Sequence, residues 1–336
     1  MKGPGHQSLY RDCVIVDATA PLSPFAAIQT VLGPDEIVNV YAEAGVTLAV
    51  FTVADDFPNS IEQTIKLIAQ NRRFFLTRPD RYVMADCADD VQTAKAEGKL
   101  AVALAFQGSN ALLGEIDLVE VYRRLGVIQM LLAYNLGNFA ADGCHEGRNA
   151  GLTQFGRSLV AEMNRVGMLV DVSHTGLRSS LEALELTTRP PLFSHSTPKK
   201  FASHDRNVTD EQIRACAAKD GLVCLTGVGL FMDGAEYKAS ASKMADTIEY
   251  VAQLVGPRHA GIGLDYIDAH SMARYLRANA ALYGGGAQYP ADGYVDYAPP
   301  SVLADVTEEL ARRGYADPDI RGILGLNYLR VLGANR

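Results

Sequence analysis

The sequence predicts a single (β/α)8 barrel of the TIM type that spans residues 1–336. Three observations support this fold class. A chain of 336 residues suits one such barrel, because these barrels commonly reach about 250 residues or more as one domain. Eight short apolar runs recur along the chain, and segments with helical periodicity lie between them. A doubly wound parallel sheet is the alternative that the same alternation allows.

The eight apolar runs are expected to be β-strands. They are apolar throughout rather than alternating, which is typical of parallel strands that are covered on both faces. In a barrel of this type, one face of each strand meets the interior and the other meets the surrounding helices. The runs lie at residues 13–18, 47–54, 101–108, 127–134, 168–174, 191–196, 222–229 and 260–266.

Segments between these runs show helical periodicity and helix-end signals. Residues 158–167 place apolar side chains on one face and stop at Gly167. Residues 209–221 begin with Thr209 as an expected N-cap, carry acids in the first turn and close at a glycine. Residues 242–256 follow the same plan. These patterns indicate helices that alternate with the strands.

Composition excludes several classes of function. The net charge is −8 and no run of Lys and Arg is present, which argues against nucleic acid as a partner. The five cysteines are widely spaced and show no CxxC pair, which favours a reducing compartment. No apolar segment reaches the roughly 18 residues of a membrane span. We therefore expect a cytoplasmic protein that acts on a small molecule.

Polar side chains follow most of the predicted strands. Because catalytic groups of a (β/α)8 barrel come from the carboxyl ends of several strands, these positions define the expected site. A single polar residue at a strand end is more often the start of a loop, so the argument depends on groups of them. The strand-end residues are Asp17, Asp55, Asp56, Gln107, Tyr134, Asn135, His174, His195 and Asp265.

Two histidines form the strongest group. His174 in "MLVDVSHTG" and His195 in "PPLFSHSTP" follow apolar runs that should be neighbouring parallel strands, about 4.8 Å apart. Their imidazoles could converge on one ion at the usual Zn–N distance of about 2 Å. The pair therefore predicts a shared metal site.

Three further features lie near the expected site. Asp265 in "GIGLDY" is a candidate general base or metal ligand, with a helix N-cap as the alternative. Arg206 could clamp a substrate carboxylate with two hydrogen bonds, with a surface or capping arginine as the alternative. His145 lies in a Gly- and Asn-rich loop and is expected to be exposed. Residues 265–301 are rich in Gly, Tyr and Pro and predict an irregular active-site loop or lid.

The same segments resemble the renal (membrane) dipeptidases, a zinc branch of the amidohydrolase superfamily. The resemblance covers roughly residues 118–266 and is carried by "GLTQFGRSLVAEMNRVGMLVDVSHTG", "PPLFSHSTPKKFASHDRNVTDEQIRA" and "AGIGLDYID". The C-terminal "GILGLNYLRVL" is also similar to the family's closing segment. The resemblance implies a metallo-dependent hydrolase-like barrel that holds two zinc ions, is often a dimer and hydrolyses dipeptides.

The resemblance also implies roles for four residues. His174 and His195 would bind the second metal of the family's pair. Arg206 would face the substrate carboxylate, and Asp265 would carry the proton between the water and the leaving amine. Each of these residues stands where the motif of the family has its counterpart.

Other positions depart from the family's pattern. The His-x-Asp pair that holds the first zinc is replaced by Thr19 and Pro21, neither of which is a good zinc ligand. The bridging glutamate is replaced by Gln107, a neutral amide that cannot offset the charge of two dications. A further family histidine is replaced by Tyr134. These departures favour one ion over two.

Three hypotheses follow. The first is a hydrolase with one zinc or another divalent ion, held by the histidine pair and completed by Gln107, water, or a carboxylate such as Asp17 or Asp265. The second is a dipeptidase with both metals. The third is a metal-free relative that binds a small ligand through Tyr134, Asn135 and Arg206 without hydrolysing it. In each case we expect a small-molecule substrate or ligand and a homodimer.

Overall fold

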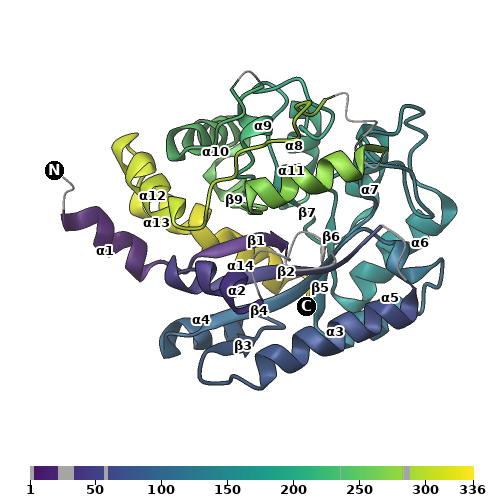
Figure 1. The fold of residues 1–336 in the computed structure, drawn as a ribbon, viewed down its shortest axis with the longest axis horizontal. Helices are drawn as coiled ribbons and strands as arrows, with labels where there is room; N and C mark the ends of the chain where they lie inside the picture. Colours follow the sequence, from purple (N-terminus) through teal and green to yellow (C-terminus); the bar gives the residue numbers. More distant parts are fainter. Residues whose placement is uncertain (1–3, 22–33, 57–59, 235, 282, 284–287) are drawn as a thin grey trace.

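The computed structural model describes residues 4–21, 34–56, 60–234, 236–281, 283 and 288–336. Eight parallel strands follow one another in the order β1-β2-β4-β5-β6-β7-β8-β9 and form a nearly closed barrel with helices around it (Figure 1). The predicted (β/α)8 fold is confirmed. The strands are β1 (Val16–Pro21), β2 (Leu48–Asp55), β3 (Tyr82–Met84), β4 (Leu100–Gln107), β5 (Val127–Leu131), β6 (Leu169–Asp171), β7 (Leu192–Ser196), β8 (Leu222–Leu225) and β9 (Ala260–Ile262).

Helices connect the strands and close the chain. They are α1 (Pro4–Asp12), α2 (Pro34–Glu43), α3 (Ile61–Leu76), α4 (Ala88–Glu97), η1 (Asn110–Leu112), α5 (Leu118–Arg124), α6 (Gln154–Val166), α7 (Leu177–Leu186), α8 (Asp210–Ala218), α9 (Gly229–Met232), α10 (Ala241–Val255), η2 (Pro257–His259), α11 (Ala269–Ala278), α12 (Val302–Arg312), α13 (Asp317–Arg321), η4 (Gly322–Leu326) and α14 (Asn327–Ala334).

Each of the eight predicted runs overlaps one strand of the barrel. The structure adds β3, which pairs with β4 beside the barrel path and was not predicted. It has only three residues, "YVM", of which one is buried and two are partly exposed. So short a strand does not produce a recognisable apolar run.

The strand β4 alternates small and large side chains between the barrel interior and its outer surface. Along β4, three alanines belong to the interior cluster, and the intervening large side chains belong to the cluster beneath the helices. The interior alanines are Ala101, Ala103 and Ala105, and the outer residues are Val102, Leu104 and Phe106. This pattern explains why every residue of β4 is buried and why the sequence reads as one continuous apolar run.

The C-terminal helix fills one end of the barrel. Tyr328, Leu329 and Leu332 of α14 belong to the same interior cluster as the barrel alanines. The hydroxyl of Tyr328 donates to the side-chain oxygen of Gln129 on β5 at 3.0 Å. This end is therefore packed, and the polar site described below lies at the carboxyl ends of the strands.

The predicted helix ends are largely confirmed. The Thr209 side chain accepts from the backbone N–H of Gln212 and caps α8, as the sequence indicates. Gly167 ends α6 in the left-handed conformation with φ of 74°. The helix α6 begins at Gln154, capped by Thr153, which is four residues before the predicted beginning at residue 158.

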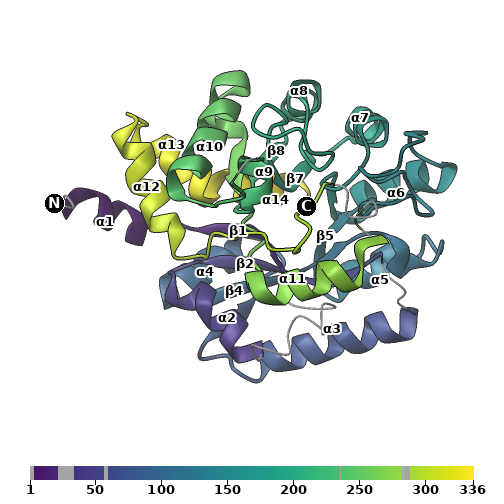
Figure 2. The same ribbon diagram turned by 45° about the horizontal axis from the view of Figure 1, so that its top comes forward.

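The stretch 265–301 is not wholly irregular, which corrects the prediction. Residues 269–278 form α11, a ten-residue helix that Figure 2 shows in front of the strands. Residues 282 and 284–287 of the stretch lie outside the described residues. The helix places Met272 beside the site. We name the described residues of 269–301 the roof, because they cover the barrel opening. Among the described residues, no helix has the length and apolar character needed to cross a membrane.

We predict that Gly263→Ala will strongly destabilise the fold. A methyl group at this position would overlap the backbone carbonyl of Ser194 in β7, which lies against the chain just after β9. We expect a loss of about 3 kcal/mol in the free energy of unfolding, measured by urea denaturation. Gly333→Ala is the matched control, because nothing lies within 4 Å of the added methyl group in α14 and alanine favours helix. Equal stability of the two variants would contradict this packing argument.

Candidate active site

The two predicted histidines meet at the carboxyl ends of β6 and β7. The Nε2 atoms of His174 and His195 lie 2.8 Å apart, and both side chains are buried. His174 has a φ of 58°, in the left-handed region that few residues other than glycine adopt. This turn of the backbone directs its ring toward the neighbouring strand.

A buried aspartate below the histidines fixes both strand ends. The Oδ1 atom of Asp171 accepts from the backbone N–H of Ser173 at 3.0 Å and of Ser194 at 3.1 Å. Each of these serines immediately precedes a histidine. The backbone N–H of His195 in turn donates to the Ser173 hydroxyl at 3.2 Å. Asp171 therefore sets the relative position of His174 and His195.

Asp171 is a functional residue that the sequence patterns did not single out. The available signal is a charged residue inside the otherwise apolar run "MLVDV", where an unpaired carboxylate would be costly. Its second oxygen accepts from the amide of Gln129 at 3.1 Å. Since Gln129 also accepts from Tyr328, a buried polar chain runs from α14 to the histidine pair.

Oxygen atoms engage the far side of each imidazole. The Nδ1 atom of His174 lies 2.7 Å from Oδ1 of Asn135. The Nδ1 atom of His195 lies 2.7 Å from the Ser194 hydroxyl and 3.2 Å from the hydroxyl of Thr19. Burial, with a smaller contribution from the Arg206 charge, holds the pKa of both histidines well below the ordinary value. Both rings are therefore neutral at pH 7, the form in which histidine binds metals.

The two histidines provide part of the ligand set that one metal ion needs. An oxygen partner at Nδ1 fixes an imidazole so that Nε2 can act as the ligand, and both histidines have such partners. No group of three or more His, Cys, Asp or Glu side chains that could hold an ion occurs among the described residues. Thr19, at an expected ligand position of the first metal, instead donates its hydroxyl to the Ala18 carbonyl at 2.7 Å. The donor set does not fit a two-metal centre.

Asp265 lies at the end of β9 with a φ of 55°. Burial raises the pKa of its carboxyl group to about 7, against the opposing effects of Arg206 and a hydrogen bond from Gln107. A carboxyl group with this pKa can exchange a proton near neutral pH. The helix-cap alternative is wrong, because α11 begins only at Ala269.

The two remaining ligand candidates have partners in the barrel. Asp17 is fully buried, and its Oδ1 accepts from the backbone N–H groups of Leu264 at 2.8 Å and Thr19 at 3.2 Å. Burial raises the pKa of Asp17 to about 7. Gln107 at the end of β4 donates its amide to the Thr52 hydroxyl at 3.1 Å. Asp17 thus ties β1 to the strand end that carries Asp265.

Arg206 is buried, so the surface-arginine alternative is wrong. Its side chain is only 3% exposed and one terminal nitrogen donates to the His195 carbonyl at 3.0 Å. The guanidinium carbon lies 5.3 Å from the centre of the Phe231 ring. Within the described part of the chain, the Nε of Arg206 has no hydrogen-bond partner. A buried arginine with an unused donor is well suited to an anionic group of a ligand.

Tyr134 and Asn135 lie against the histidine pair. The ring of Tyr134 stacks on that of His174, with centroids 4.0 Å apart and an interplanar angle of 23°. The Tyr134 hydroxyl lies 3.4 Å from the hydroxyl of Tyr283 in the roof. Asn135 has its amide oxygen on His174, so its first role is to orient that ring. Contact of either residue with a ligand stays a prediction.

Two further histidines border the site. The His145 side chain is only 3% exposed, so the expectation that it is exposed in its loop was wrong. It lies beside His204, with ring centroids 5.7 Å apart, and both rings contact Tyr289. Burial lowers the pKa of His204 to about 3, so this ring is neutral. The loops that bring these residues together are far apart in sequence, which is why no sequence pattern paired them.

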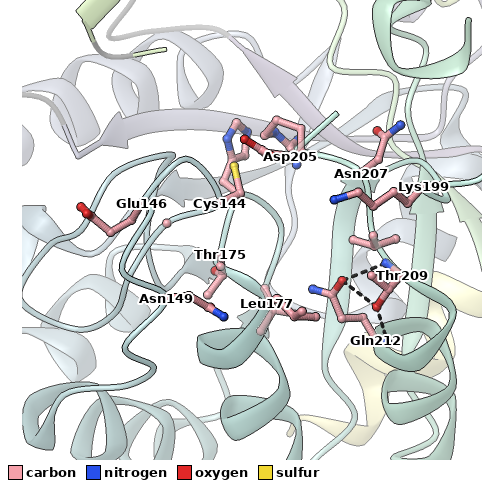
Figure 3. A pocket seen from close by; sticks show the side chains of 16 residues that line it. Cys144, Glu146, Asn149, Thr175, Leu177, Lys199, Asp205, Asn207, Thr209 and Gln212 are labelled. Atoms are coloured by element: carbon pink, nitrogen blue, oxygen red, sulfur yellow. Dashed lines mark hydrogen bonds between the residues drawn. The ribbon is translucent and has the colours of Figure 1, made fainter. Parts of the chain in front are cut away.

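Two cavities meet at His174 and Arg206. The first, which we name the polar chamber, has a volume of about 170 Å3. Figure 3 shows Lys199, Asn207, Thr209 and Gln212 on one side of it and Thr175, Asn149 and Leu177 on the other. The second, which we name the aromatic chamber, has a volume of about 20 Å3. It is lined by Tyr134, His174, Arg206, Val228, Leu230, Phe231, Asp265, Met272, Tyr283, Tyr289, Val295 and Tyr297.

This combination of barrel, histidine pair and buried arginine agrees with the comparison with known proteins. Residues 38–276 match the model of the membrane dipeptidase family, peptidase family M19. The chain belongs to the membrane dipeptidase family. The matched range contains His174, His195, Arg206 and Asp265, whose roles in the reaction stay predictions.

Several family relatives are similar over most of this chain. A dipeptidase of Aspergillus oryzae, aclJ, is 31% identical over 81% of the chain and 61% of its own length. A dipeptidase of Claviceps purpurea, tcpJ, is 27% identical over 81% of the chain and 60% of its own length. The chain therefore spans about three fifths of these relatives. A crystal structure described as an amidohydrolase from Pseudomonas aeruginosa superposes with a TM-score of 0.83 at 26% identity and covers 98% of both chains.

We predict that Asp171→Ala will destabilise the protein by about 3 kcal/mol, because two buried backbone N–H groups lose their acceptor. Asp171→Asn is the matched variant, since it keeps an oxygen for those groups and should cost clearly less. Urea denaturation measures both. If the alanine variant were as stable as the native protein, Asp171 would not be the link between the strand ends.

The raised pKa of Asp265 predicts a pH-dependent stability in the metal-free protein. The folded carboxyl group stays protonated up to about pH 7, whereas in the unfolded chain it ionises near pH 4. Its contribution to stability is therefore complete at low pH and is lost as the pH rises toward 7. We expect the native protein to lose stability relative to Asp265→Asn between pH 4 and 7, as measured by thermal unfolding. Asp80→Asn, which removes an exposed carboxylate instead, is the matched control.

Proposed function

We propose that this protein is a metal-dependent, dipeptidase-like hydrolase. It cleaves an amide or related C–N bond of a small carboxylated substrate, such as a dipeptide or an analogue, with water. The observation that carries the proposal is the convergence of a histidine pair, a proton-exchanging carboxyl group and a buried arginine with a free donor. Membership of the membrane dipeptidase family and the dipeptidase relatives support the same reaction class.

The chain's own residues account for binding and proton transfer. Arg206 binds the substrate carboxylate through its unused donor and so places the scissile amide beside Asp265. Asp265 takes a proton from the attacking water and delivers it to the leaving nitrogen. The C–N bond breaks as the water oxygen bonds to the carbonyl carbon, which yields a carboxylic acid and an amine. The roof excludes bulk water and strengthens the electrostatic contacts.

The metal would be held by His174 and His195 through their Nε2 atoms. We propose one ion, zinc or another divalent metal, with Gln107 and Asp17 as candidates for further ligands. When bound, such an ion supplies Lewis acidity and lowers the pKa of water. This assignment is supported by the oxygen partners at the far side of both imidazoles.

We also propose that residues 1–336 form one domain and that the protein is a cytoplasmic homodimer. The five cysteines form no disulfide bond, which supports a reducing compartment. The resemblance to a family that is often dimeric supports the assembly. Neither proposal affects the chemistry of the site within one chain.

A metal-free binding function is the second candidate. The observation in its favour is the direct Nε2 to Nε2 contact of 2.8 Å, which is a hydrogen-bond distance between two neutral rings. Two histidine ligands are also fewer than the three protein ligands usual for catalytic zinc. In that case Arg206 and the aromatic chamber would bind a small carboxylate ligand without turnover.

Metal analysis separates these two functions. We predict about one divalent ion per chain in the native protein and loss of that ion in His174→Ala, with a fall in amide hydrolysis of more than about 100-fold. His259→Gln is the control, because the ring of this partly buried histidine lies 2.8 Å from the Gly221 carbonyl, at the amino end of β8 and so away from the site. A native protein that binds no metal, and that no added divalent ion activates, would contradict the hydrolase and favour the binding function.

A further inference from the structure

The aromatic chamber contains very little charge. Nine of its lining residues are apolar or aromatic, and the charged residues among them are Arg206 and Asp265. Two nearby carboxylates have other partners. Asp205 accepts from the amide of Gln288 at 2.8 Å, and Asp296 accepts from the backbone N–H of Ala239 at 3.0 Å. Asp265 is therefore the carboxylate that the chamber offers to a ligand.

A free dipeptide would place a positive charge in this chamber. If its carboxylate binds Arg206, its α-ammonium lies on the other side of the scissile bond, toward the aromatic residues. That ammonium would either remain unpaired in an apolar cavity or pair with Asp265, the residue that must carry the proton. Burial of an unpaired ammonium group is strongly unfavourable. The chamber is thus a poor site for a substrate with a free α-amine.

The tyrosines do not form an open cage for a cation. An ammonium group is attracted to the face of an aromatic ring, so a cage needs free faces. Here one face of Tyr134 is covered by the His174 ring at 4.0 Å. Tyr283 packs edge to face with Tyr289 at 5.3 Å and with Tyr134 at 6.4 Å. The rings contact one another, which suits a flat or branched apolar group that inserts between them.

We propose that the acyl half of the substrate is an uncharged aromatic or bulky apolar group, so that this protein acts on N-acyl amino acids in preference to free dipeptides. The proposal rests on the proposed hydrolysis at the same site and names its substrate class. Arg206 lies at the boundary of both chambers. The amino-acid half, with its carboxylate, would occupy the polar chamber beside Lys199, and the acyl half would enter the aromatic chamber.

The closed aromatic chamber must widen to admit an acyl group. Its volume of about 20 Å3 is close to that of a single water molecule. The residues that close it, such as Met272, Tyr283 and Tyr297, form a hydrophobic cluster separate from the two clusters of the barrel. The helix α11, which carries Met272, can therefore move without disturbing the barrel core, and an apolar acyl group restores the lost contacts. A charged group would not restore them.

A matched pair of ligands tests the proposal. The dipeptide Phe-Gly and 3-phenylpropanoyl-glycine differ only in the α-amine, and at about pH 6.5 that amine is charged. Isothermal titration calorimetry on the full chain should give a dissociation constant at least about 10-fold lower for 3-phenylpropanoyl-glycine. Acetyl-glycine, which lacks the ring, should bind more weakly than 3-phenylpropanoyl-glycine. Equal or tighter binding of Phe-Gly, or binding of neither, would overturn the proposal.

Substitutions at Met272 test whether the acyl group binds in the aromatic chamber. Met272→Glu places a carboxylate in the chamber and should reduce the preference for 3-phenylpropanoyl-glycine by about 10-fold, whereas the neutral Met272→Leu should retain it. Arg206→Gln should weaken both ligands alike, because both carry the same carboxylate. A preference unchanged in Met272→Glu would place the acyl group elsewhere and overturn the assignment.

Glycine release, measured with and without added zinc, separates this proposal from the hydrolase itself. If 3-phenylpropanoyl-glycine binds tightly but is not cleaved, the proposed hydrolysis fails and the ligand class stands. If Phe-Gly is cleaved with the higher kcat/KM, the hydrolase stands and the preference for N-acyl substrates fails.

Discussion

The site depends on one buried carboxylate. Asp171 joins β6 to β7 through two backbone N–H groups, and each of these belongs to the residue before a histidine. A buried charge-bearing group is tolerated only when its hydrogen bonds are satisfied, and a satisfied network rigidifies the segments that it joins. Gln129 supplies the remaining partner and connects this network to Tyr328 at the packed end of the barrel. The positions of His174 and His195 therefore follow from the barrel's interior and not from their own loops.

The charges of the side chains distinguish the two halves of the metal site that the family resemblance implies. Two adjacent dications need carboxylate ligands, and the two positions where the resemblance implies a carboxylate hold Pro21 and Gln107, while Thr19 stands in place of a histidine. The surviving half consists of two neutral histidines beside one buried arginine and one carboxyl group. That half is near electrical neutrality without an ion, so the single dication proposed above would be less unfavourable there than two. A second dication would meet uncompensated repulsion.

Sequence patterns predicted those parts of the molecule that local rules determine. The apolar runs gave the barrel strands, and the ends of neighbouring strands brought His174 and His195 together, because parallel strands share their carboxyl edge. The contact of Asn135 with His174 depends on a left-handed turn and could not be derived from spacing. The burial of Arg206 and His145 depends on how separate loops pack, which no local pattern encodes. The helix α11 was hidden by the Gly, Tyr and Pro around it.

The roof determines what kind of chemistry the site can perform. Burial of the Arg206 guanidinium is unfavourable in free energy. Its hydrogen bond to the His195 carbonyl and its contact with the Phe231 ring offset this penalty. Both contacts leave its Nε free, so the protein maintains a strong anion-binding group in a region from which water is excluded. Such a group discriminates in favour of a carboxylate on one half of a ligand. The tyrosines on the other side discriminate against charge on the other half, because their rings pack against one another and the hydroxyls of Tyr134 and Tyr283 already contact each other. Burial of the site therefore has two consequences. It favours a ligand that is charged at one end and apolar at the other, and it raises the pKa of Asp265 into the range useful for proton transfer.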